Sequence, residues 1–209
     1  MRMEKIIFTC ESVTPIFMYG ADGKTPELRP ASIKGVMRFW WRAINGNLSL
    51  DKLKEKEDKI FGSTEKKSSF SIKIRNDKFN GNNIKKNYQF KIEFLISSKS
   101  DFDLKSFFEL VVILGGFGKS AKKINQGKIK IINIKEDEKE EISYKEPHNL
   151  EDILKLLQKF NTNFNIENHK IVSNDFKFNY PMVHEIFVEN NTLNTKLKEE
   201  KIFKRSLDG

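Results

Sequence analysis

The residues of this sequence that best match a chemical task are basic and lie in one short segment. Lys34, Arg38 and Arg42 are spaced four residues apart, so on a helix they project from one stripe, with Arg29 just upstream. Like charges at this spacing repel each other, and the helix therefore needs a compensating anion. Trp41 falls beside the two arginines of the stripe. Arginines beside a large aromatic ring suit single-stranded nucleic acid, in which arginine binds phosphates and aromatic rings stack on bases.

A structural interpretation of the same segment is open as well. The arginines could pair with carboxylates of the next segment, at Glu55, Glu57 or Asp58. Trp40 falls on the apolar face of the expected helix, and Trp41 could be a core residue too.

A second candidate site is the glycine- and lysine-rich stretch 115–127, GGFGKSAKKINQG. Glycines let the backbone approach a phosphate closely and adopt positive φ, and lysines attract the same anion. The spacing differs from the G-x-x-x-x-G-K-[ST] pattern, so the stretch is no Walker P-loop. A helix C-cap followed by a loop is the structural alternative. The candidate phosphate-binding residues of this stretch are Gly116, Gly118, Lys119, Lys122, Lys123 and Gly127.

Other chemistries find little support. The single cysteine, Cys10, can form neither an internal disulfide nor a thiolate metal cluster, and this fits a reducing cytoplasm. The three histidines lie far apart, and no Ser-His-Asp, Cys-His or paired-carboxylate arrangement can be singled out. We therefore expect no metal and no cofactor.

The composition is compatible with a polyanionic partner. The 209 residues include 38 Lys and Arg and 29 Asp and Glu, a formal net charge of +9. An AT-rich genome, whose codons favour Lys, Asn, Ile and Phe, would raise the lysine content without a binding role.

The 18 phenylalanines argue against a disordered chain. The longest nearly apolar stretch, 110–117, is too short to span a bilayer, and the N-terminus resembles no secretion signal, so we expect a cytoplasmic protein without a membrane partner.

Hydrophobic periodicity gives the elements that must position these residues. A long loop, 16–30, precedes the basic helix, for which Ser32 is the expected N-cap; Asp103 is the expected cap of a later helix. The strands at 69–75 and 88–97 are expected to form an antiparallel hairpin. The expected elements are strand 5–13, helix 33–44, a charged helix 49–60, strands 69–75 and 88–97, helix 104–114 and strand 128–135.

This order predicts an α+β fold, with a ferredoxin-like (RRM-like) β-α-β-β-α-β domain over residues 1–135. Residues 144–209 are expected to form a short mixed α/β C-terminal extension, for which a reduced second ferredoxin-like half is one interpretation. Within it we expect helices at 149–160 and 195–204, with short strand-like pieces between them.

Four segments carry a family resemblance. The runs TPIFMYGADG and LRPASIKGVMRFWWRA, followed by IFGS, resemble the N-terminal signature of the first subunit of the Cmr module, a RAMP-superfamily protein of type III-B CRISPR effector complexes. The stretch 115–127 resembles the glycine-rich loop of that superfamily. It ends Ile124-Asn125-Gln126-Gly127, where the family more often has a Gly-aromatic-Gly ending. The resemblance covers about residues 5–130.

The resemblance implies a non-catalytic RNA-binding subunit of a Cmr ribonucleoprotein complex in antiviral defence. Such a subunit contacts the 3′ region of the guide RNA, the target RNA or both, at the head of the complex, and its partners are other RAMP subunits. The RNA-contact candidates on the basic helix are Arg29, Ser32, Lys34, Arg38, Trp41 and Arg42.

Two other functions stay open. In RAMP backbone subunits an acidic residue in the loop before this helix supports metal-dependent cleavage of target RNA. Asp22 occupies a comparable place, with Glu27 nearby, and an ordinary Asp-Gly turn is the structural alternative. A purely structural adaptor that docks neighbouring subunits is the third interpretation.

Overall fold

The computed structural model describes residues 3–75, 83–118, 127–147, 149–175, 180–189 and 192–198. The chain divides into two compact units, one of residues 1–37 and 59–146, the other of residues 38–58 and 147–209. Helix α1 (Pro30–Ile44) contributes its first turns to the first unit and the rest to the second. The predicted domain boundaries, 1–135 and 144–209, stay a prediction.

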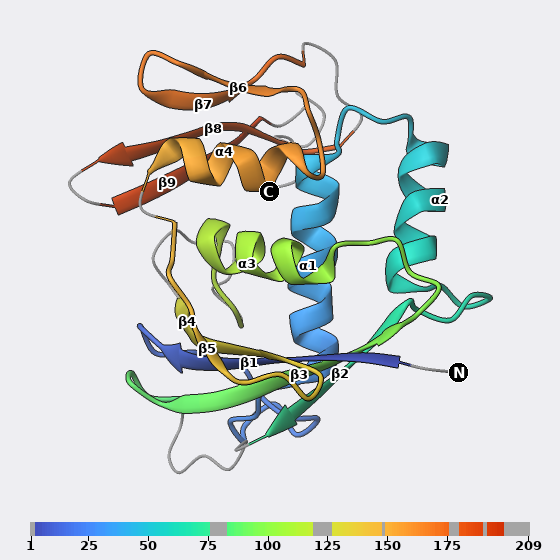
Figure 1. Cartoon of the computed structure of the whole chain (residues 1–209), viewed down its shortest axis with the longest axis vertical. Helices are drawn as coiled ribbons and strands as arrows, with labels where there is room; N and C mark the ends of the chain where they lie inside the picture. Colours follow the sequence, from blue (N-terminus) through green and yellow to red (C-terminus); the bar gives the residue numbers. More distant parts are fainter. Residues whose placement is uncertain are drawn as a thin grey trace. The chain divides into compact units, whose positions relative to one another are not determined.

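The first unit is built on a five-stranded antiparallel sheet in the order β2-β3-β1-β4-β5 (Figure 1). On the central strand, Phe8 lies opposite Ile92 of β3 and Ile134 of β4. Strands β2 and β3 form the predicted antiparallel hairpin. The strands are β1 (Met3–Ser12), β2 (Phe70–Arg75), β3 (Gln89–Ser97), β4 (Ile129–Glu136) and β5 (Ile142–Ser143).

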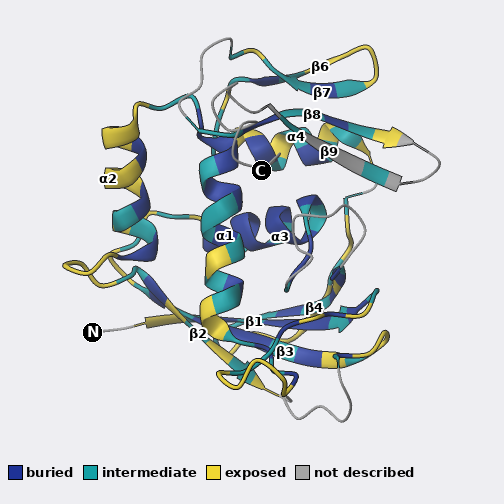
Figure 2. Cartoon of the chain, turned by 180° about the vertical axis from the view of Figure 1, so that it is seen from behind, coloured by how far each residue is buried: buried dark blue, intermediate teal, exposed yellow. Residues whose placement is uncertain are grey.

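Helix α3 (Leu104–Leu114) lies along one face of this sheet (Figure 1). Its predicted cap is confirmed, because the Asp103 carboxylate accepts a hydrogen bond from the Ser106 N–H at 3.0 Å. Strand alternation turns apolar side chains toward the helix, where the ring centroid of Phe108 lies 4.7 Å from that of Phe8 and 5.1 Å from that of Phe94. The buried stretches of these elements are dark in Figure 2.

The basic helix begins three residues earlier than a cap at Ser32 allows. Pro30 is the first residue of α1, where its missing N–H costs nothing and its fixed φ suits a helix. The carbonyl of Arg29 accepts the hydrogen bond from the Ile33 N–H at 3.1 Å. The prediction of Ser32 as the cap is therefore wrong, and Ser32 lies within the first turn instead.

The second unit contains the charged helix α2 (Leu50–Phe61) up to residue 58, and α4 (Leu150–Gln158) with its own sheet. Asn149 caps α4, since its side chain accepts the Asp152 N–H at 2.8 Å. The sheet is an antiparallel meander in the order β6-β7-β8-β9. Its strands are β6 (Phe164–Glu167), β7 (Lys170–Ser173), β8 (Met182–Glu189) and β9 (Thr192–Lys198).

The last strand corrects one prediction. The expected helix over 195–204 is wrong for the described residues 195–198, which belong to β9 and pair with β8. Leu193 and Leu197 fit the period of a helix and that of a strand equally, so pairing with Val188 and Val183 of β8 decides the outcome. The predicted α+β class, with antiparallel sheets, is confirmed.

Candidate nucleic-acid interface

The predicted long loop before α1 contains an ordered turn. Tyr19 and Pro26 form an isolated antiparallel bridge, and the Gly20 N–H donates to the Thr25 carbonyl at 2.8 Å. Gly23 closes the turn with φ +67°, a conformation that glycine adopts without strain. The turn thereby holds the preceding residues beside the start of α1.

Asp22 is engaged inside this turn. Its carboxylate accepts the N–H groups of Lys24 and Thr25, each at 2.9 Å, and the Thr25 hydroxyl. These hydrogen bonds, that of the hydroxyl above all, lower the pKa of Asp22 to about 2. Nowhere in the described residues do three or more His, Cys, Asp and Glu side chains gather in a way that could hold a metal ion.

Between this turn and α1 lies a depression of about 290 Å³, which we call the loop hollow. It brings together Ser32 and Gly118, two of the predicted site residues from segments far apart in sequence. Among the described residues, none of the side chains that line it is charged, and Phe17 at its rim is 39% exposed. The loop hollow is lined by Phe17, Met18, Tyr19, Gly20, Gly23, Ser32, Val36 and Gly118.

The glycines of the stretch 115–127 have different tasks. Gly118 has φ +92°, and a Cβ there would lie 2.6 Å from the Phe17 carbonyl oxygen. Gly127 has φ +62°, and a Cβ there would lie 2.0 Å from the Phe117 carbonyl oxygen. Gly116 and Gly127 are buried, so only Gly118 lines the loop hollow. Three further candidates fall outside the described residues: Lys119, Lys122 and Lys123.

The arginine stripe of α1 has its anion within the chain. The Arg38 Nε lies 3.2 Å from Glu57 Oε1, and Arg42 binds both oxygens of the same carboxylate through Nε and Nη2. The side chain of Glu57 is only 6% exposed. Its hydrogen bonds raise the pKa of Arg42, and the ring of Tyr180 lies 5.6 Å from the guanidinium carbon. This arrangement matches the structural alternative considered for the stripe.

Both tryptophans of α1 are buried. Trp40 is 5% exposed, as a core residue should be, and Trp41 is 4% exposed. The neighbours Ala43 and Ile44 are also buried, whereas the side chains of Arg38 and Arg42 in the same half are 35% exposed. The prediction that Trp41 stacks on RNA bases therefore conflicts with its position, because no face of its ring is open to a base.

The first turns of α1 keep the remaining candidates at the surface. Arg29 and Ser32 are half-buried, and the Arg29 N–H contacts the Met18 sulfur at 3.1 Å. The Lys34 ammonium lies 5.0 Å from the centroid of the Phe70 ring, as in a cation–π contact. Phe17 was missed in the sequence, although an aromatic residue just ahead of a glycine-rich turn is a usable signal for a stacking surface.

In the described part of the chain, every helix is too short or too polar to cross a bilayer.

Comparisons with known proteins place this geometry in a family. The model of the RAMP superfamily matches residues 9–208. CRISPR system Cmr subunit Cmr1-2 of Pyrococcus furiosus is 49% identical over 74 residues, which are 34% of this chain and 40% of that protein. The chain thus matches less than half the length of this relative.

Two solved structures share the fold. The apo crystal structure of Cmr1 from Pyrococcus furiosus aligns with a TM-score of 0.54 at 21% identity, over 76% of this chain and 59% of that one. A chain of the type III-B Cmr-beta complex bound to cognate target RNA aligns with a TM-score of 0.50 at 12% identity, over 65% of this chain and 55% of that one. By its family match this chain belongs to the RAMP superfamily, and it is related to Cmr1 of type III-B CRISPR complexes.

Proposed function

We propose that this chain is a non-catalytic RNA-binding subunit of a type III-B CRISPR (Cmr) ribonucleoprotein complex. In this role it contacts the guide RNA near its 3′ end, the target RNA, or both, beside other RAMP subunits in the cytoplasm. The relationship to Cmr1 supports the assembly. The strand order β4-β1-β3-β2, with α1 after β1 and α3 after β3, supports a ferredoxin-like first unit.

The observation that carries the RNA contact is the loop hollow. A depression with an exposed aromatic ring at its rim, and with no charged side chain among its described lining residues, suits a base, because every base has a face that can stack. Phe17 takes the stacking role that the sequence assigned to Trp41. Arg29, next to the first turn of α1, supplies a positive charge for the neighbouring backbone phosphate.

The sheet offers no comparable platform. In RRM domains, aromatic residues on the open sheet face stack on bases. Here the outward positions of the described strands instead carry cross-strand ion pairs, such as Arg75 with Glu93 at 3.3 Å and Lys130 with Glu11 at 2.7 Å. The RNA contact is therefore proposed at the loop hollow and not on the sheet.

The engagement of Asp22 in its own turn supports the non-catalytic assignment. A carboxylate that already accepts three hydrogen bonds from its loop would have to give them up to hold a metal ion. In the alternative, metal-dependent cleavage of target RNA through Asp22, Glu27 is the second carboxylate, because the side chains of both residues lie beside Gly20. A metal ion there would still have to displace the hydrogen bonds of Asp22.

The test is the affinity of the full chain for a fluorescent single-stranded RNA, measured by anisotropy. Phe17→Ala should weaken binding about 5- to 150-fold, the equivalent of one stacked base at ~1–3 kcal/mol. Leu50→Ala, which removes a 62% exposed apolar side chain from α2, is the matched control and should leave affinity unchanged. Equal affinity of the Phe17→Ala variant and wild type would refute the loop hollow as the RNA site.

A further experiment separates the adaptor interpretation. The wild-type chain is mixed with the other subunits of a Cmr complex, and its incorporation is followed by size-exclusion chromatography. Incorporation by a chain that binds no RNA would favour a structural adaptor over the proposed function.

A further inference from the structure

A second depression lies in the first unit, at the ends of β2 and β3 away from the loop hollow. It measures about 290 Å³, and we call it the serine–lysine hollow. The end of α2, the turn 62–69, the turn 97–100 and the start of α3 enclose it. Its polar lining consists of three lysines, one aspartate and four serines, and the residues that matter here are Lys59, Lys67, Ser97, Lys99, Ser100 and Asp101.

Two of the serine hydroxyls have a donor left over. The Ser97 Oγ accepts the Lys99 N–H at 3.4 Å, and the Ser100 Oγ accepts the Phe102 N–H at 3.3 Å. A hydroxyl that accepts a hydrogen bond still carries its own O–H. Within the described residues, neither O–H donates to an acceptor, so both can donate to a group inside the hollow.

The lysines leave a positive charge at the same place. Lys59 is paired with Asp101 at 3.1 Å, and this contact lowers the pKa of that carboxyl. Lys67 and Lys99 are exposed and form no ion pair with the described part of the chain. Two ammonium groups and two hydroxyl donors thus face one depression in which the only carboxylate is already neutralised. This is the donor set of an oxyanion site.

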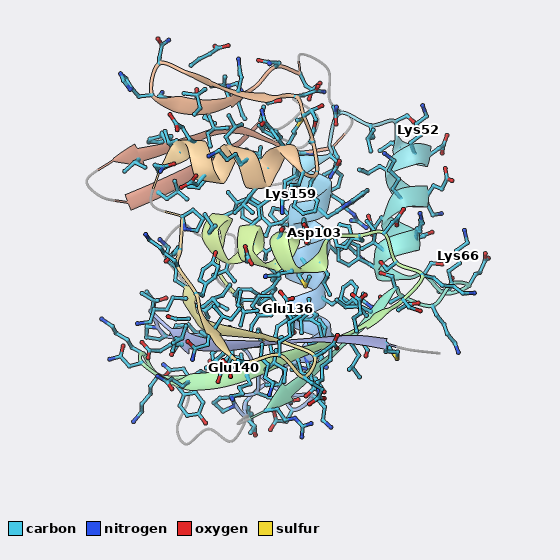
Figure 3. The ribbon with its side chains drawn as sticks, in the orientation of Figure 1. Lys52, Lys66, Asp103, Glu136, Glu140 and Lys159 are labelled. Atoms are coloured by element: carbon cyan, nitrogen blue, oxygen red, sulfur yellow. The ribbon has the colours of Figure 1, made fainter. Side chains whose placement is uncertain are left out.

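The backbone that carries these groups is rigidly built. Gly62 has φ +79°, and a Cβ there would lie 2.7 Å from the Ser68 N and 2.8 Å from the Lys66 carbonyl oxygen. The Ser69 N–H donates to the Ile60 carbonyl at 3.0 Å, which ties the turn back to α2. In Figure 3, Lys66 extends outward from this turn. The glycine of the IFGS segment is therefore needed to fold the turn that presents Lys67.

The other end of the hollow is fixed in the same way. The Ser97 N–H donates to the Ser69 carbonyl at 2.8 Å, and the Ser100 N–H donates to the Ser97 carbonyl at 2.9 Å. Asp103, labelled in Figure 3 at the start of α3, caps that helix directly after the turn. Both serine hydroxyls are thus held in place without a ligand.

We propose that the serine–lysine hollow binds a phosphate oxyanion through the ammonium groups of Lys67 and Lys99 and the hydroxyls of Ser97 and Ser100. The phosphate comes either from the backbone of an RNA strand or from a free phosphate-bearing small molecule. The RNA source rests on the proposed function, whereas phosphate binding itself does not.

The test uses the full chain and two probes. In the first arm, inorganic phosphate is titrated while backbone amide shifts are followed by NMR, against sodium chloride at matched ionic strength. We expect shifts in the amides of residues 97–101 that chloride does not cause, and at least a five-fold weaker response in the double variant Lys67→Gln, Lys99→Gln. Ser100→Ala should weaken the response several-fold.

The second arm identifies the source. If an RNA backbone supplies the phosphate, the double variant should reduce the slope of log affinity against log salt by about 1.4, or 0.7 for each lost contact with a single strand. A phosphate response with an unchanged RNA slope would identify a free phosphate as the ligand instead. Lys73→Gln, Lys145→Gln is the matched control, because it removes two exposed lysines of the same unit outside this hollow.

Two results would overturn the proposal. One is the absence of both a phosphate-specific shift and a change in RNA slope; the other is an equal loss in the control variant. If the phosphate arm shows no specific shift, RNA binding that is lost on Phe17→Ala and unchanged in Lys67→Gln, Lys99→Gln would reject this site and leave the proposed function standing. A wild-type chain that binds no RNA would reject the proposed function and leave the phosphate arm to decide this site.

Discussion

The two halves of α1 differ in what their side chains do. The first turns, up to Met37, expose Pro30 and Gly35 and contribute Ser32 and Val36 to the loop hollow. The second half, from residue 38 on, buries both tryptophans and binds both arginines to one carboxylate. One family signature runs through both halves, yet of the two only the first half lines the loop hollow that we propose as the RNA site.

A helix rich in basic residues does not necessarily have positive charge available for a ligand. Arg38 and Arg42 look like the strongest RNA ligands in the sequence, but Glu57 on α2 takes their hydrogen bonds. Removing the arginines from the nearly buried Glu57 would leave its carboxylate without a counter-charge. A phosphate that binds the arginines must therefore compete with Glu57. Ser32 and Val36, which line the loop hollow at the start of the helix, are uncharged, so an ion pair cannot occupy them in this way.

Removal of Trp41 should have the largest effect. Trp41→Ala should lower the free energy of unfolding by about 3–5 kcal/mol, because it leaves a cavity in a packed region. Urea denaturation followed by circular dichroism measures this loss, and Leu50→Ala on the exposed side of α2 should change it by less than about 0.5 kcal/mol. Full stability combined with lost RNA affinity would instead make Trp41 a stacking residue and erase the difference between the halves.

The ion pair of the second half comes next. Glu57→Gln keeps the shape of the side chain but weakens its interactions with both arginines. It should lower the free energy of unfolding by about 1.5–2 kcal/mol. This is the low end of the range for charged hydrogen bonds, because the arginine side chains are 35% exposed. The same urea assay measures it, with Glu55→Gln on the exposed face of α2 as the control.

The RNA affinity of the Glu57→Gln variant is a second test of the same ion pair. The Glu57→Gln variant leaves one more net positive charge, so its RNA affinity should stay equal or rise slightly at low salt. A marked fall in RNA affinity without a loss of stability would show that Glu57 orients the arginines for RNA. The second half of α1 would then be a binding surface as well.

Substitutions of two glycines, Gly118 and Gly35, test the role of the loop hollow and of the first half of α1. Gly118→Ala should cost about 1–3 kcal/mol of stability, because a side chain at φ +92° is strained and its Cβ meets the Phe17 carbonyl. RNA affinity should fall as well, since Phe17 must shift. Gly35→Ala is the opposite control, because nothing lies within 4 Å of its Cβ position in a helix, and it should raise stability by about 0.5–1 kcal/mol. Equal thermal unfolding of both variants would contradict the assigned role of Gly118.

Local signals in the sequence predicted most of the fold. Strand alternation and the cap at Asp103 predicted elements of the first unit correctly. A half-buried strand alternates apolar and polar residues, and a capped helix begins after a residue such as Asp, so both signals lie within a few neighbouring positions of the sequence. The start of α1 and the strand β9 were mispredicted for different reasons. At the start of α1, Pro30 is a local signal for the first helical position, and Ser32 was preferred to it. At Leu193 and Leu197, a helix and a strand satisfy the same local pattern, and the choice depends on the residues of β8 that lie opposite.

The candidate site was predictable only in part. Ser32 and Gly118 were singled out from chemistry and resemblance, and they meet in the loop hollow. The sequence also offered Glu57 as a partner for the arginines, but three carboxylates on the next helix were equivalent at that stage. Which of them is buried depends on the packing of that helix, and the exposure of Phe17 depends on the turn beside it. Neither is encoded in spacing alone.

The smallest expected effect concerns the turn that supports the loop hollow. Because hydrogen bonds lower the pKa of Asp22 to about 2, below the ordinary value near 3.9, its ionised form stabilises the turn. That contribution is complete above the ordinary pKa and is lost as the pH falls toward 2. The carboxyl carbon shift of Asp22, followed by NMR, should therefore titrate near pH 2, with the amides of Lys24 and Thr25 moving alongside.

The same residue decides between a turn and a metal ligand. Between pH 5 and 8 the turn stays intact, so Asp22 should add no pH dependence to RNA affinity, and Mg²⁺ should leave its carboxyl shift unchanged. Asp22→Asn keeps an oxygen acceptor and should weaken RNA binding less than Asp22→Ala, which removes the acceptor of all three hydrogen bonds. RNA cleavage that requires Mg²⁺ and disappears equally in both variants would assign Asp22 to catalysis. The turn before α1 would then contain a catalytic residue, and the difference between the two halves of α1 would be one between catalysis and structure.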